Sequence, residues 1–406
     1  MQWCPCERSC CYPFGLWWST LVSGLASRPA DGSQIVFIHM LRGIAPLLVL
    51  WAHIPGWWLI DRGLKWPPFE WFKTLLVEPL RLYQNAGHLG VMLFFLISGY
   101  IISAVAVRET RAEFVLKRVM RLVPPLVAAV VMMFLATRLG HSLGLGTILG
   151  DSAGSVSHYA LTAVLANWFV SIPGALSVTW SLVTEVVFYA LVVLLFGQLR
   201  RAPVLATYAM MGAFAVLLLP VKVSPYLAYL AYFTVYLPLM IQGRIFLLLH
   251  SGTATPAQSA AMSAANVLLF LVLYASRFPG QLFLAGQEPA VTYALATATF
   301  YAVMVSTPRR CPLVLSFFAD ISYALYLVHL PVGMLLLSAL HRPQLPFTVA
   351  CAAAIAGSIG AAWLLHIGVE RPSQSLARRW AAALRARQSV VAPAQSDGQH
   401  IVGRLT

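Results

Sequence analysis

Residues 88–107 read HLGVMLFFLISGYIISAVAV, a run of 20 residues in which only His88 titrates near neutral pH. An α-helix of about 20 mainly apolar residues is long enough to cross the hydrocarbon core of a membrane. Within the run, Ser98 and Gly99 are small enough to let another helix approach closely. Ten such runs occur along the chain, at residues 35–58, 88–107, 119–138, 176–198, 203–220, 226–249, 262–277, 290–307, 320–340 and 347–368. The sequence therefore predicts an all-α fold, a polytopic membrane bundle of about ten transmembrane helices.

The composition of the 406-residue chain excludes an ordinary soluble domain. Hydrophobic residues make up 60% of it and charged residues 10%, whereas soluble domains carry roughly 25% charged residues. The 27 Lys and Arg against 13 Asp and Glu give a net charge of +14, which in a soluble protein would suggest a nucleic-acid partner. Here the basic residues fall in short clusters between apolar runs, so we expect the lipid bilayer as the partner and no nucleic acid.

The distribution of Lys and Arg between alternate loops predicts the topology. With the N-terminus inside, the loops and tail on the cytoplasmic side hold 16 of these residues, Arg244 among them, and the opposite loops hold 8. Because cytoplasmic loops collect basic residues, both termini are predicted to be cytoplasmic in a multi-pass protein of the inner, cytoplasmic membrane. Residues 1–34 are then an N-terminal extension expected to be disordered, residues 35–375 the transmembrane domain, and residues 376–406 a cytoplasmic tail that is basic and then disordered.

The six cysteines do not form the pattern of a disulfide-stabilised protein. Cys311 and Cys351 lie in apolar surroundings. The other four crowd the N-terminus: Cys4, Cys6, Cys10 and Cys11. These four could bind zinc, but they lack the two well-separated pairs typical of structural zinc sites. We expect reduced thiols and no metal site.

Two ionisable residues, Arg42 and His53, interrupt the first apolar segment. Such residues deep in a membrane cost something like 2.5 to 3.5 kcal/mol each, so they are candidates for function. Eleven residues at about 100° each leave a net rotation of about 20°, so both side chains share one helical face, roughly 16 Å apart along the axis. The alternative is an Arg42 side chain that extends to the interface and a His53 that only hydrogen-bonds to a neighbouring helix.

Glu185 and His329 are the other deep ionisable residues. Glu185 lies about ten residues into the segment 176–198, with Tyr189 one turn later on the same face. A carboxylate at that depth needs a cation or a hydrogen-bond donor, and Arg42 is one candidate partner, so Glu185 could hold a structural ion pair or take part in catalysis. His329 could serve a proton relay, a substrate contact or only a helix contact.

Arg118 and Arg121 lie three residues apart, on one helical face, beside the inner end of the segment 119–138. Paired arginines suit phosphate groups because each guanidinium offers a planar fork of donors. Cytoplasmic loops collect such charges in any case, so the pair could equally reflect topology alone.

Six short motifs, taken together, resemble the acyltransferase 3 family of membrane proteins, which acylate extracytoplasmic sugars and other acceptors. Each motif is weak alone, but the six occur in the family's order over residues 35 to 375. They are Arg42 with His53 at their spacing, Gly90-Val-x-Leu-Phe-Phe-x-x-Ser-Gly-Tyr100, Arg118-x-x-Arg121, Trp180-Ser-Leu-x-x-Glu185-x-x-Phe-Tyr189, Ile321-Ser-Tyr-x-Leu-Tyr-Leu-x-His329 and Glu370-Arg-Pro372.

The resemblance implies an O-acyltransferase with acyl-CoA, expected to be acetyl-CoA, as co-substrate and no tightly bound cofactor. The implied acceptor is a hydroxyl on the outer side of the membrane, expected to belong to a cell-surface or exported glycan. His53 is the first candidate for the chemistry, because a neutral imidazole can take a proton from an attacking hydroxyl or carry the acyl group itself. Arg42 would polarise the thioester carbonyl or orient the site.

The remaining motif residues take binding and supporting roles in this interpretation. Arg118 and Arg121 would hold the phosphates of CoA, and Glu185 would steady a cation or the acceptor. Four further residues would contact substrate or support the site: Tyr189, Tyr323, His329 and Glu370.

The chain departs from the family's pattern at Met92, where many relatives have a polar residue, commonly Asp. Some relatives also carry a fused SGNH-type hydrolase domain, for which the residues outside 35–375 leave no room here. The protein is therefore expected to acylate its acceptor directly or to pass the acyl group to a separate extracytoplasmic transferase. The alternative function is a proton-coupled secondary transporter of a small solute, since intramembrane Arg, Glu and His residues can also form a proton pathway.

Overall fold

The computed structural model describes residues 33–145, 155–218, 225–283, 286–342 and 344–391, and in this part of the chain every regular element is a helix. The all-α fold predicted from the sequence is thereby confirmed. The predicted N-terminal extension, apart from its last two residues, lies outside the described residues, and so do its four cysteines and the disordered end predicted for the tail, residues 392–406.

The α-helices are separated by short turns and by 3₁₀- and π-helical segments. In chain order the α-helices are α2 Ser33–Trp51, α3 Trp58–Asp61, α4 Pro67–Phe72, α5 Gly87–Ala106, α6 Arg111–Ser142, α7 Val156–Ala163, α8 Thr179–Leu194, α9 Gln198–Arg201, α10 Pro203–Leu218, α11 Pro225–Thr234, α12 Leu237–His250, α13 Pro256–Arg277, α14 Pro289–Ser306, α15 Leu313–Asp320, α16 Ser322–Leu340, α17 Phe347–Leu365 and α18 Arg371–Val391. The π-helical segments are η1 Ala52–Trp57, η2 Lys73–Val77 and η6 His366–Glu370, and the 3₁₀ segments are η3 Tyr83–Ala86 and η4 Ala166–Phe169.

Seven helices of the described chain are long and apolar enough to cross a membrane: Val36–Asp61, Tyr83–Ala106, Arg111–Ser142, Pro256–Arg277, Pro289–Ser306, Ser322–Leu340 and Phe347–Ala386. Three other predicted segments contain only shorter apolar helices, Thr179–Leu194, Pro203–Val216 and Leu237–His250. The count of ten transmembrane helices is therefore not confirmed. The predicted segment 226–249 is divided between α11 and α12, where Pro238 takes a place in the first turn of the new helix, a position that proline favours.

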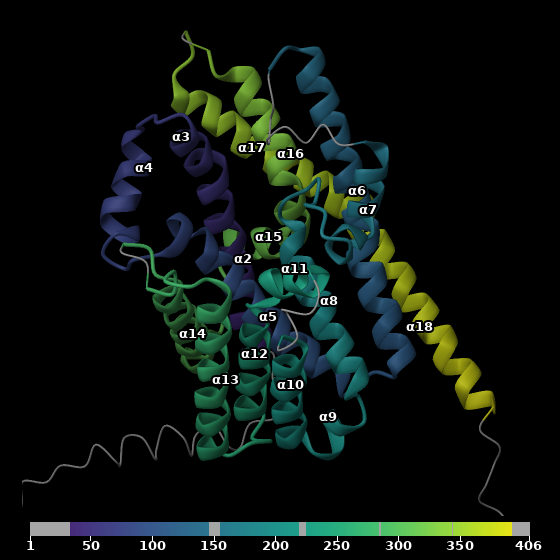
Figure 1. Ribbon diagram of the computed structural model, residues 1–406. Coiled ribbons are helices and arrows are strands. Elements are labelled where there is room, and N and C mark those ends of the chain that lie inside the picture. The colour runs from purple at the N-terminus through teal and green to yellow at the C-terminus, as the bar shows by residue number, and fades with distance from the viewer. Residues whose placement is uncertain (1–32, 146–154, 219–224, 284–285, 343, 392–406) are drawn as a thin grey trace, which may run out of the picture.

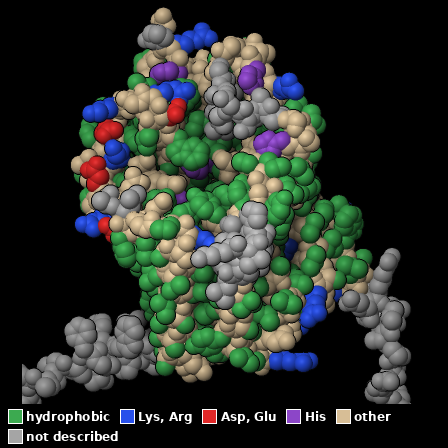
Figure 2. Space-filling view, in the orientation of Figure 1, with side chains coloured by type: hydrophobic (Ala, Val, Ile, Leu, Met, Phe, Trp, Pro, Cys, Tyr) green, Lys and Arg blue, Asp and Glu red, His purple; other side chains and the backbone are tan. Residues whose placement is uncertain are grey.

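Helix α5 lies at the centre of the bundle, packed between α2 and α12 and in contact with α14. In Figure 1, α10, α12, α13 and α14 run alongside one another, while α6 and α18 lie on the opposite side of the molecule. Helix α16 joins the two sides, because it packs against α2, α6 and α17. Hydrophobic side chains cover much of the visible surface in Figure 2, as expected for helices that face lipid tails.

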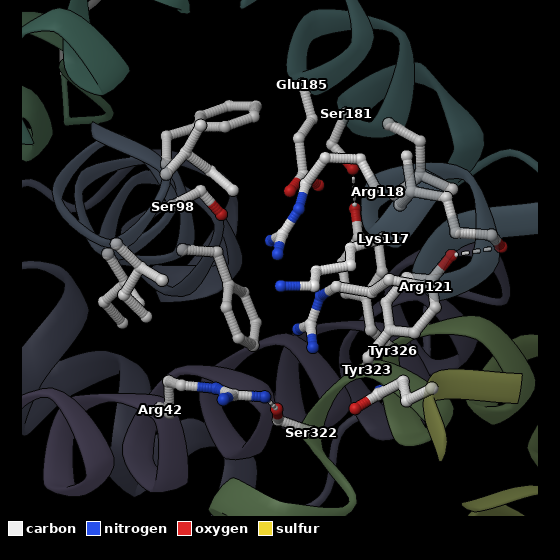
Figure 3. Close-up of a pocket in the computed structure, with 18 of the residues that line it drawn as sticks. Arg42, Ser98, Lys117, Arg118, Arg121, Ser181, Glu185, Ser322, Tyr323 and Tyr326 are labelled. Atoms are coloured by element: carbon white, nitrogen blue, oxygen red, sulfur yellow. Dashed lines mark hydrogen bonds between the residues drawn. The ribbon is translucent and has the colours of Figure 1, made fainter. Parts of the chain in front are cut away.

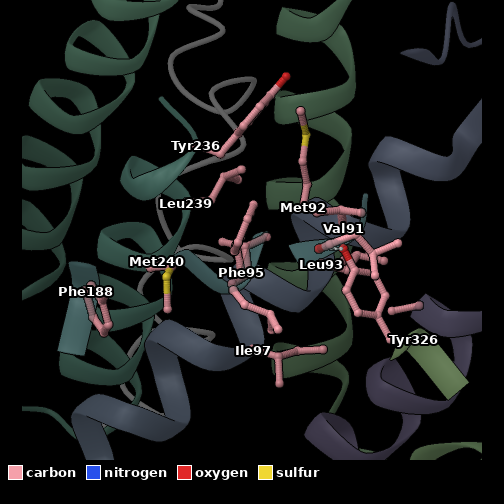
Figure 4. Close-up of a cluster of buried hydrophobic side chains, with 14 of the residues drawn as sticks. Val91, Met92, Leu93, Phe95, Ile97, Phe188, Tyr236, Leu239, Met240 and Tyr326 are labelled. Atoms are coloured by element: carbon pink, nitrogen blue, oxygen red, sulfur yellow. Dashed lines mark hydrogen bonds between the residues drawn. The ribbon is translucent and has the colours of Figure 1, made fainter. Parts of the chain in front are cut away.

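The core around α5 is apolar at the position where the chain departs from the family's pattern. Met92 is fully buried and belongs to the same cluster as Val91, Leu93 and Met240 (Figure 4). A polar side chain at this depth would need a hydrogen-bonding partner. At residue 92 itself the side chain therefore serves packing, and any role that a polar residue has there in relatives is absent or moved to another residue in this chain.

Two glycines allow α5 and α12 to pack closely, and one of them, Gly99, was predicted from the sequence to do so. A methyl group on Gly99 would overlap the backbone carbonyl of Met240 on α12, and one on Gly243 would overlap that of Leu96 on α5. Gly99→Ala is therefore expected to separate the two helices and to lower the unfolding free energy by about 1–3 kcal/mol, the usual cost of overpacking.

Thermal unfolding of the detergent-solubilised protein measures this effect. The matched control is Gly212→Ala on α10, where an added methyl group meets no atom within 4 Å, so stability should be unchanged or slightly increased. Equal stability of the two variants would show that α5 and α12 are not in tight contact.

The structure corrects the interpretation of Arg244 and describes the basic part of the tail. Arg244, counted as a loop charge, is 1% exposed inside α12 and donates hydrogen bonds to Thr207 Oγ1 at 3.0 Å and to the Pro203 carbonyl at 3.1 Å. The basic part of the tail forms α18, which packs along α6. There Arg385 Nε lies 2.6 Å from Glu113 Oε1, so this part of the tail is structured.

Candidate functional site

A cavity of about 380 Å³ lies between α2, α5, α6, α8, α16 and α18, near the end of the bundle where α5 ends and α6 begins. We call it the basic cavity, because its charged lining comprises five cations and two carboxylates: Arg42, Lys117, Arg118, Arg121, Arg378, Glu109 and Glu185. Lys117 and Glu109 form an ion pair at 2.7 Å. Four cations then face one carboxylate, a balance that favours a ligand with several negative charges.

The predicted pair on α6 does face this cavity. Figure 3 shows Lys117, Arg118 and Arg121 pointing from α6 toward the space that Arg42 enters from α2. The Arg118 guanidinium lies 5.7 Å from the ring centre of Phe114, and that of Arg121 lies 5.8 Å from the ring centre of Tyr323. Aromatic rings attract a guanidinium without occupying its N–H donors, so both forks stay available to a ligand.

Arg42 does not pair with Glu185 in the described structure. Its Nη2 donates a hydrogen bond to Ser322 Oγ at 3.0 Å, at the start of α16. Glu185 instead accepts a hydrogen bond from the hydroxyl of Tyr189, one turn along α8. The predicted common face of Glu185 and Tyr189 is thereby confirmed, and the carboxylate has a partner that does not depend on Arg42.

Tyr323 also lines the basic cavity, and its hydroxyl donates to the Leu122 carbonyl at 3.0 Å. This bond ties α16 to α6 directly after Arg121, so Tyr323 holds the arginine pair as well as lying beside Arg121. The residue therefore supports the wall of the cavity, and a role in contacting substrate stays a prediction.

A second cavity of about 430 Å³ lies toward the other end of the bundle, where α5 begins. We call it the aromatic cavity. Its aromatic lining residues are Trp57, Tyr83, Trp168, Trp180, Tyr229, Tyr232, Phe233, Tyr236, Tyr274, Phe278 and Tyr326. Among the described residues that line it, none is Lys, Arg, Asp or Glu, and the histidines are His53 and His88. Aromatic faces and hydroxyl groups suit a ligand that is uncharged and carries both C–H and O–H groups.

The two histidines of the aromatic cavity differ in what their nitrogens contact. His88 Nδ1 lies 3.0 Å from Gln84 Oε1 and its Nε2 lies 3.0 Å from the Tyr236 hydroxyl. His53 Nδ1 lies 2.7 Å from His329 Nε2, and within the described chain its Nε2 has no hydrogen-bond partner. Only His53 can therefore offer a ring nitrogen to a ligand in this cavity.

His53 lies in the π-helical segment η1, which contains Pro55. Single π-helical turns are rare and often occur at functional sites. The Trp57 ring is 4.0 Å from the His53 ring, centre to centre, so the imidazole is held between Trp57 and His329. The sequence predicted an α-helix that continues through His53 and gave no sign of this local widening.

The basic and aromatic cavities share two lining residues, Val91 and Tyr326. The Tyr326 hydroxyl lies 2.7 Å from Ser181 Oγ and donates to the Val178 carbonyl at 3.2 Å. These bonds hold the ring of Tyr326 between α16 and α8. Two side chains thus form the partition between a cationic cavity and an uncharged one.

No group of three His, Cys, Asp or Glu residues in the described part of the chain could hold a metal ion. The described thiols, Cys311 and Cys351, are free. The four N-terminal cysteines lie outside the described residues.

Comparison with protein families supplies the decisive observation. The family model described as an acyltransferase domain, that of the acyltransferase 3 family, matches residues 35–367, most of the chain. The protein belongs to the acyltransferase 3 family. With its apolar spanning helices it is a multi-pass membrane acyltransferase. The searches of curated proteins and of solved structures gave no match.

The motif residues of this acyltransferase do not all converge on one place. Those that line the basic cavity are Arg42, Arg118, Arg121, Glu185 and Tyr323. His53 lines the aromatic cavity, and His329 reaches it only through His53. Glu370 lines neither cavity: it is 1% exposed, bonded to His366 Nδ1 at 2.8 Å and to Gln374 Nε2 at 3.1 Å. It therefore fixes the junction between η6 and α18.

Sequence reasoning missed several lining residues of the acyltransferase. In the sequence, Lys117 and Arg378 count only as cytoplasmic charges that indicate topology. In the structure both line the basic cavity, with Gln374 and Ala377 beside Arg378 on the same face of α18. This helix lies beyond the matched residues 35–367. In the sequence, the only indication that these residues share a helical face is the spacing of three and four residues from Gln374 to Ala377 and Arg378. The aromatic lining residues carry no linear motif.

Proposed function

We propose that this acyltransferase of the inner membrane transfers an acyl group, expected to be acetyl, from cytoplasmic acyl-CoA to a hydroxyl of an extracytoplasmic glycan. The observation that carries the proposal is the pair of cavities, one cationic and one aromatic, that meet at Val91 and Tyr326. The cationic cavity complements a donor that carries several phosphate groups. The aromatic cavity complements an uncharged sugar.

The donor side of the proposal is the basic cavity. Arg118 and Arg121 hold phosphate groups of CoA with their guanidinium forks, and Arg378 adds positive charge from α18. The charge of Lys117 is balanced by its ion pair with Glu109. Arg42 enters the same cavity from α2, the helix that continues into η1 and His53. We expect its guanidinium to bind or polarise the thioester carbonyl as negative charge develops on the carbonyl oxygen.

The acceptor side is the aromatic cavity. Sugar rings present C–H faces to aromatic side chains and hydroxyl groups to hydrogen-bonding partners. The cavity volume of about 430 Å³ lies within the roughly 300–1,000 Å³ typical of small-molecule sites. Room for an acceptor beside His53 favours direct acylation over transfer to a separate extracytoplasmic protein.

The chemical step needs one base on the acceptor side, and His53 lines the aromatic cavity. His53 takes the proton of the acceptor hydroxyl as that oxygen bonds to the acyl carbon. The carbon–sulfur bond then breaks, and the thiolate of CoA receives the proton from His53. An enclosed site between helices limits competing hydrolysis by water.

Purified protein in detergent, given acetyl-CoA labelled in its acetyl group and a panel of oligosaccharides, tests this function. We expect label on a glycan hydroxyl with matching release of CoA, and better transfer to neutral glycans than to uronate-containing ones. Gradient-driven solute uptake into proteoliposomes, without any release of CoA, would instead establish the transporter.

The same assay tests the donor side with a pair of adjacent arginines. Both arginines are exposed on α18, but only Arg378 lines the basic cavity. Arg378→Ala should raise the KM for acetyl-CoA about tenfold, since a hydrogen bond to a charged group contributes about 1.5–3 kcal/mol and exposure reduces it. Arg379→Ala should leave the KM unchanged. Equal values for the two variants would exclude α18 from donor binding.

A further inference from the structure

The contact between His53 and His329 determines which nitrogen of each ring carries hydrogen. His329 is 1% exposed on α16, and its Nδ1 lies 3.0 Å from the Leu325 carbonyl oxygen, one turn earlier. A carbonyl oxygen can only accept a hydrogen bond, so Nδ1 of His329 must carry the hydrogen. In a neutral imidazole the other nitrogen is then unprotonated. The Nε2 of His329 is therefore an acceptor.

His53 must supply the hydrogen for the bond between the rings. Its Nδ1 lies 2.7 Å from His329 Nε2, so Nδ1 of His53 is the donor and its Nε2 carries the free lone pair. The ring planes differ by 9° and their centres are 5.0 Å apart. If the two rings were stacked face to face, no atom of one could come closer to the other than van der Waals contact. The nitrogen–nitrogen distance of 2.7 Å is shorter than that, so the two parallel rings meet edge to edge. This arrangement gives the in-plane hydrogen bond that an sp² nitrogen lone pair requires.

The neighbours of the pair agree with a neutral arrangement. No Lys, Arg, Asp or Glu lines the aromatic cavity among the described residues. Trp57 covers one side of His53, and His329 engages the Nδ1 edge. The Nε2 edge is what remains for a substrate.

We propose that His329 is a positioning residue that fixes the tautomer of His53, so that Nε2 of His53 is the base for the acceptor hydroxyl. The inference rests on the proposed function of His53 and specifies how that residue is prepared. During transfer, Nε2 of His53 takes the hydroxyl proton and later gives it to the thiolate. The Nδ1 hydrogen stays in the bond to His329 throughout, so protons balance with no further base.

Two amide variants of His329 separate this role from simple packing. In His329→Gln the side-chain oxygen takes the place of Nε2 and can accept from His53, whereas in His329→Asn the amide can keep only the bond to Leu325. We expect the kcat of His329→Gln to stay within about tenfold of the wild type and that of His329→Asn to fall by about 10²-fold or more, within the range of general-base effects. The KM for acetyl-CoA should not change in either.

Equal kcat values in the two variants, or a higher value for His329→Asn, would overturn the proposal. Solid-state NMR of the ¹⁵N-histidine-labelled wild-type protein in lipid gives a second measurement that needs no variant of His329. With His53 assigned by its loss in His53→Ala, its Nδ1 should be protonated and its Nε2 should not. The opposite tautomer overturns the proposal even if the enzyme is active. An inactive wild-type enzyme with the expected tautomer would contradict only the proposed function.

Discussion

Replacing His53 by Ala is expected to lower acyl transfer by about 10²- to 10⁴-fold, the range that a positioned general acid or base contributes. The protein should still fold, because His53 lies at a cavity wall and its removal leaves no buried charge. The only hydrogen bond of its ring in the described structure is the one to His329 Nε2, an acceptor that water in the cavity can satisfy.

His88 provides a matched control in the same cavity. It is also a histidine on the lining, but both of its nitrogens are engaged, by Gln84 and Tyr236. His88→Gln should therefore act mainly on the KM for the acceptor and should leave kcat within about tenfold, because it removes no free base. Kinetics with labelled acetyl-CoA, together with thermal unfolding of each variant, measure both effects. Near-normal transfer by His53→Ala would show that the assignment of the base is wrong.

The sequence predicted the fold class well because membrane helices depend on an average property. Hydrophobicity summed over about 20 residues tolerates local exceptions, and all ten predicted segments contain helix. Helix ends and breaks depend on single residues and tertiary contacts. The widening of η1 at His53 and the burial of Arg244 against α10 could not be read from periodicity.

The candidate site was predictable only where neighbouring residues share a helix. Helical spacing predicted that Arg118 shares a face with Arg121 on α6, and Glu185 with Tyr189 on α8, and the structure has both pairs so arranged. His53 and His329 are 276 residues apart, and nothing in either segment indicates the other. The aromatic cavity takes its rings singly from many helices, so it exists only after folding.

Arg42 is expected to be the residue with the largest effect on the donor side. Arg42→Met should reduce kcat by about 10²- to 10³-fold, as the loss of one donor to a developing oxyanion does in other enzymes. Arg42→Lys keeps the charge without the fork and should fall between Arg42→Met and the wild type. A variant that leaves Arg42 intact, Ser322→Ala, removes the hydroxyl that its Nη2 contacts at 3.0 Å and should cost much less.

Stability distinguishes this role from that of a structural ion pair. If Arg42 were the partner of Glu185, its loss would leave an uncompensated buried charge at a cost of about 3–5 kcal/mol. In the structure Glu185 is bonded by Tyr189 and shares its cavity with Arg118 and Arg121, so it keeps a donor and two cations when Arg42 is removed. We therefore expect the unfolding temperature of Arg42→Met to lie within a few degrees of the wild-type value, although its kcat falls by about 10²- to 10³-fold. A large fall in thermal stability with an unchanged kcat in the folded fraction would assign Arg42 to the structure of the bundle and leave the thioester without its proposed electrophilic partner.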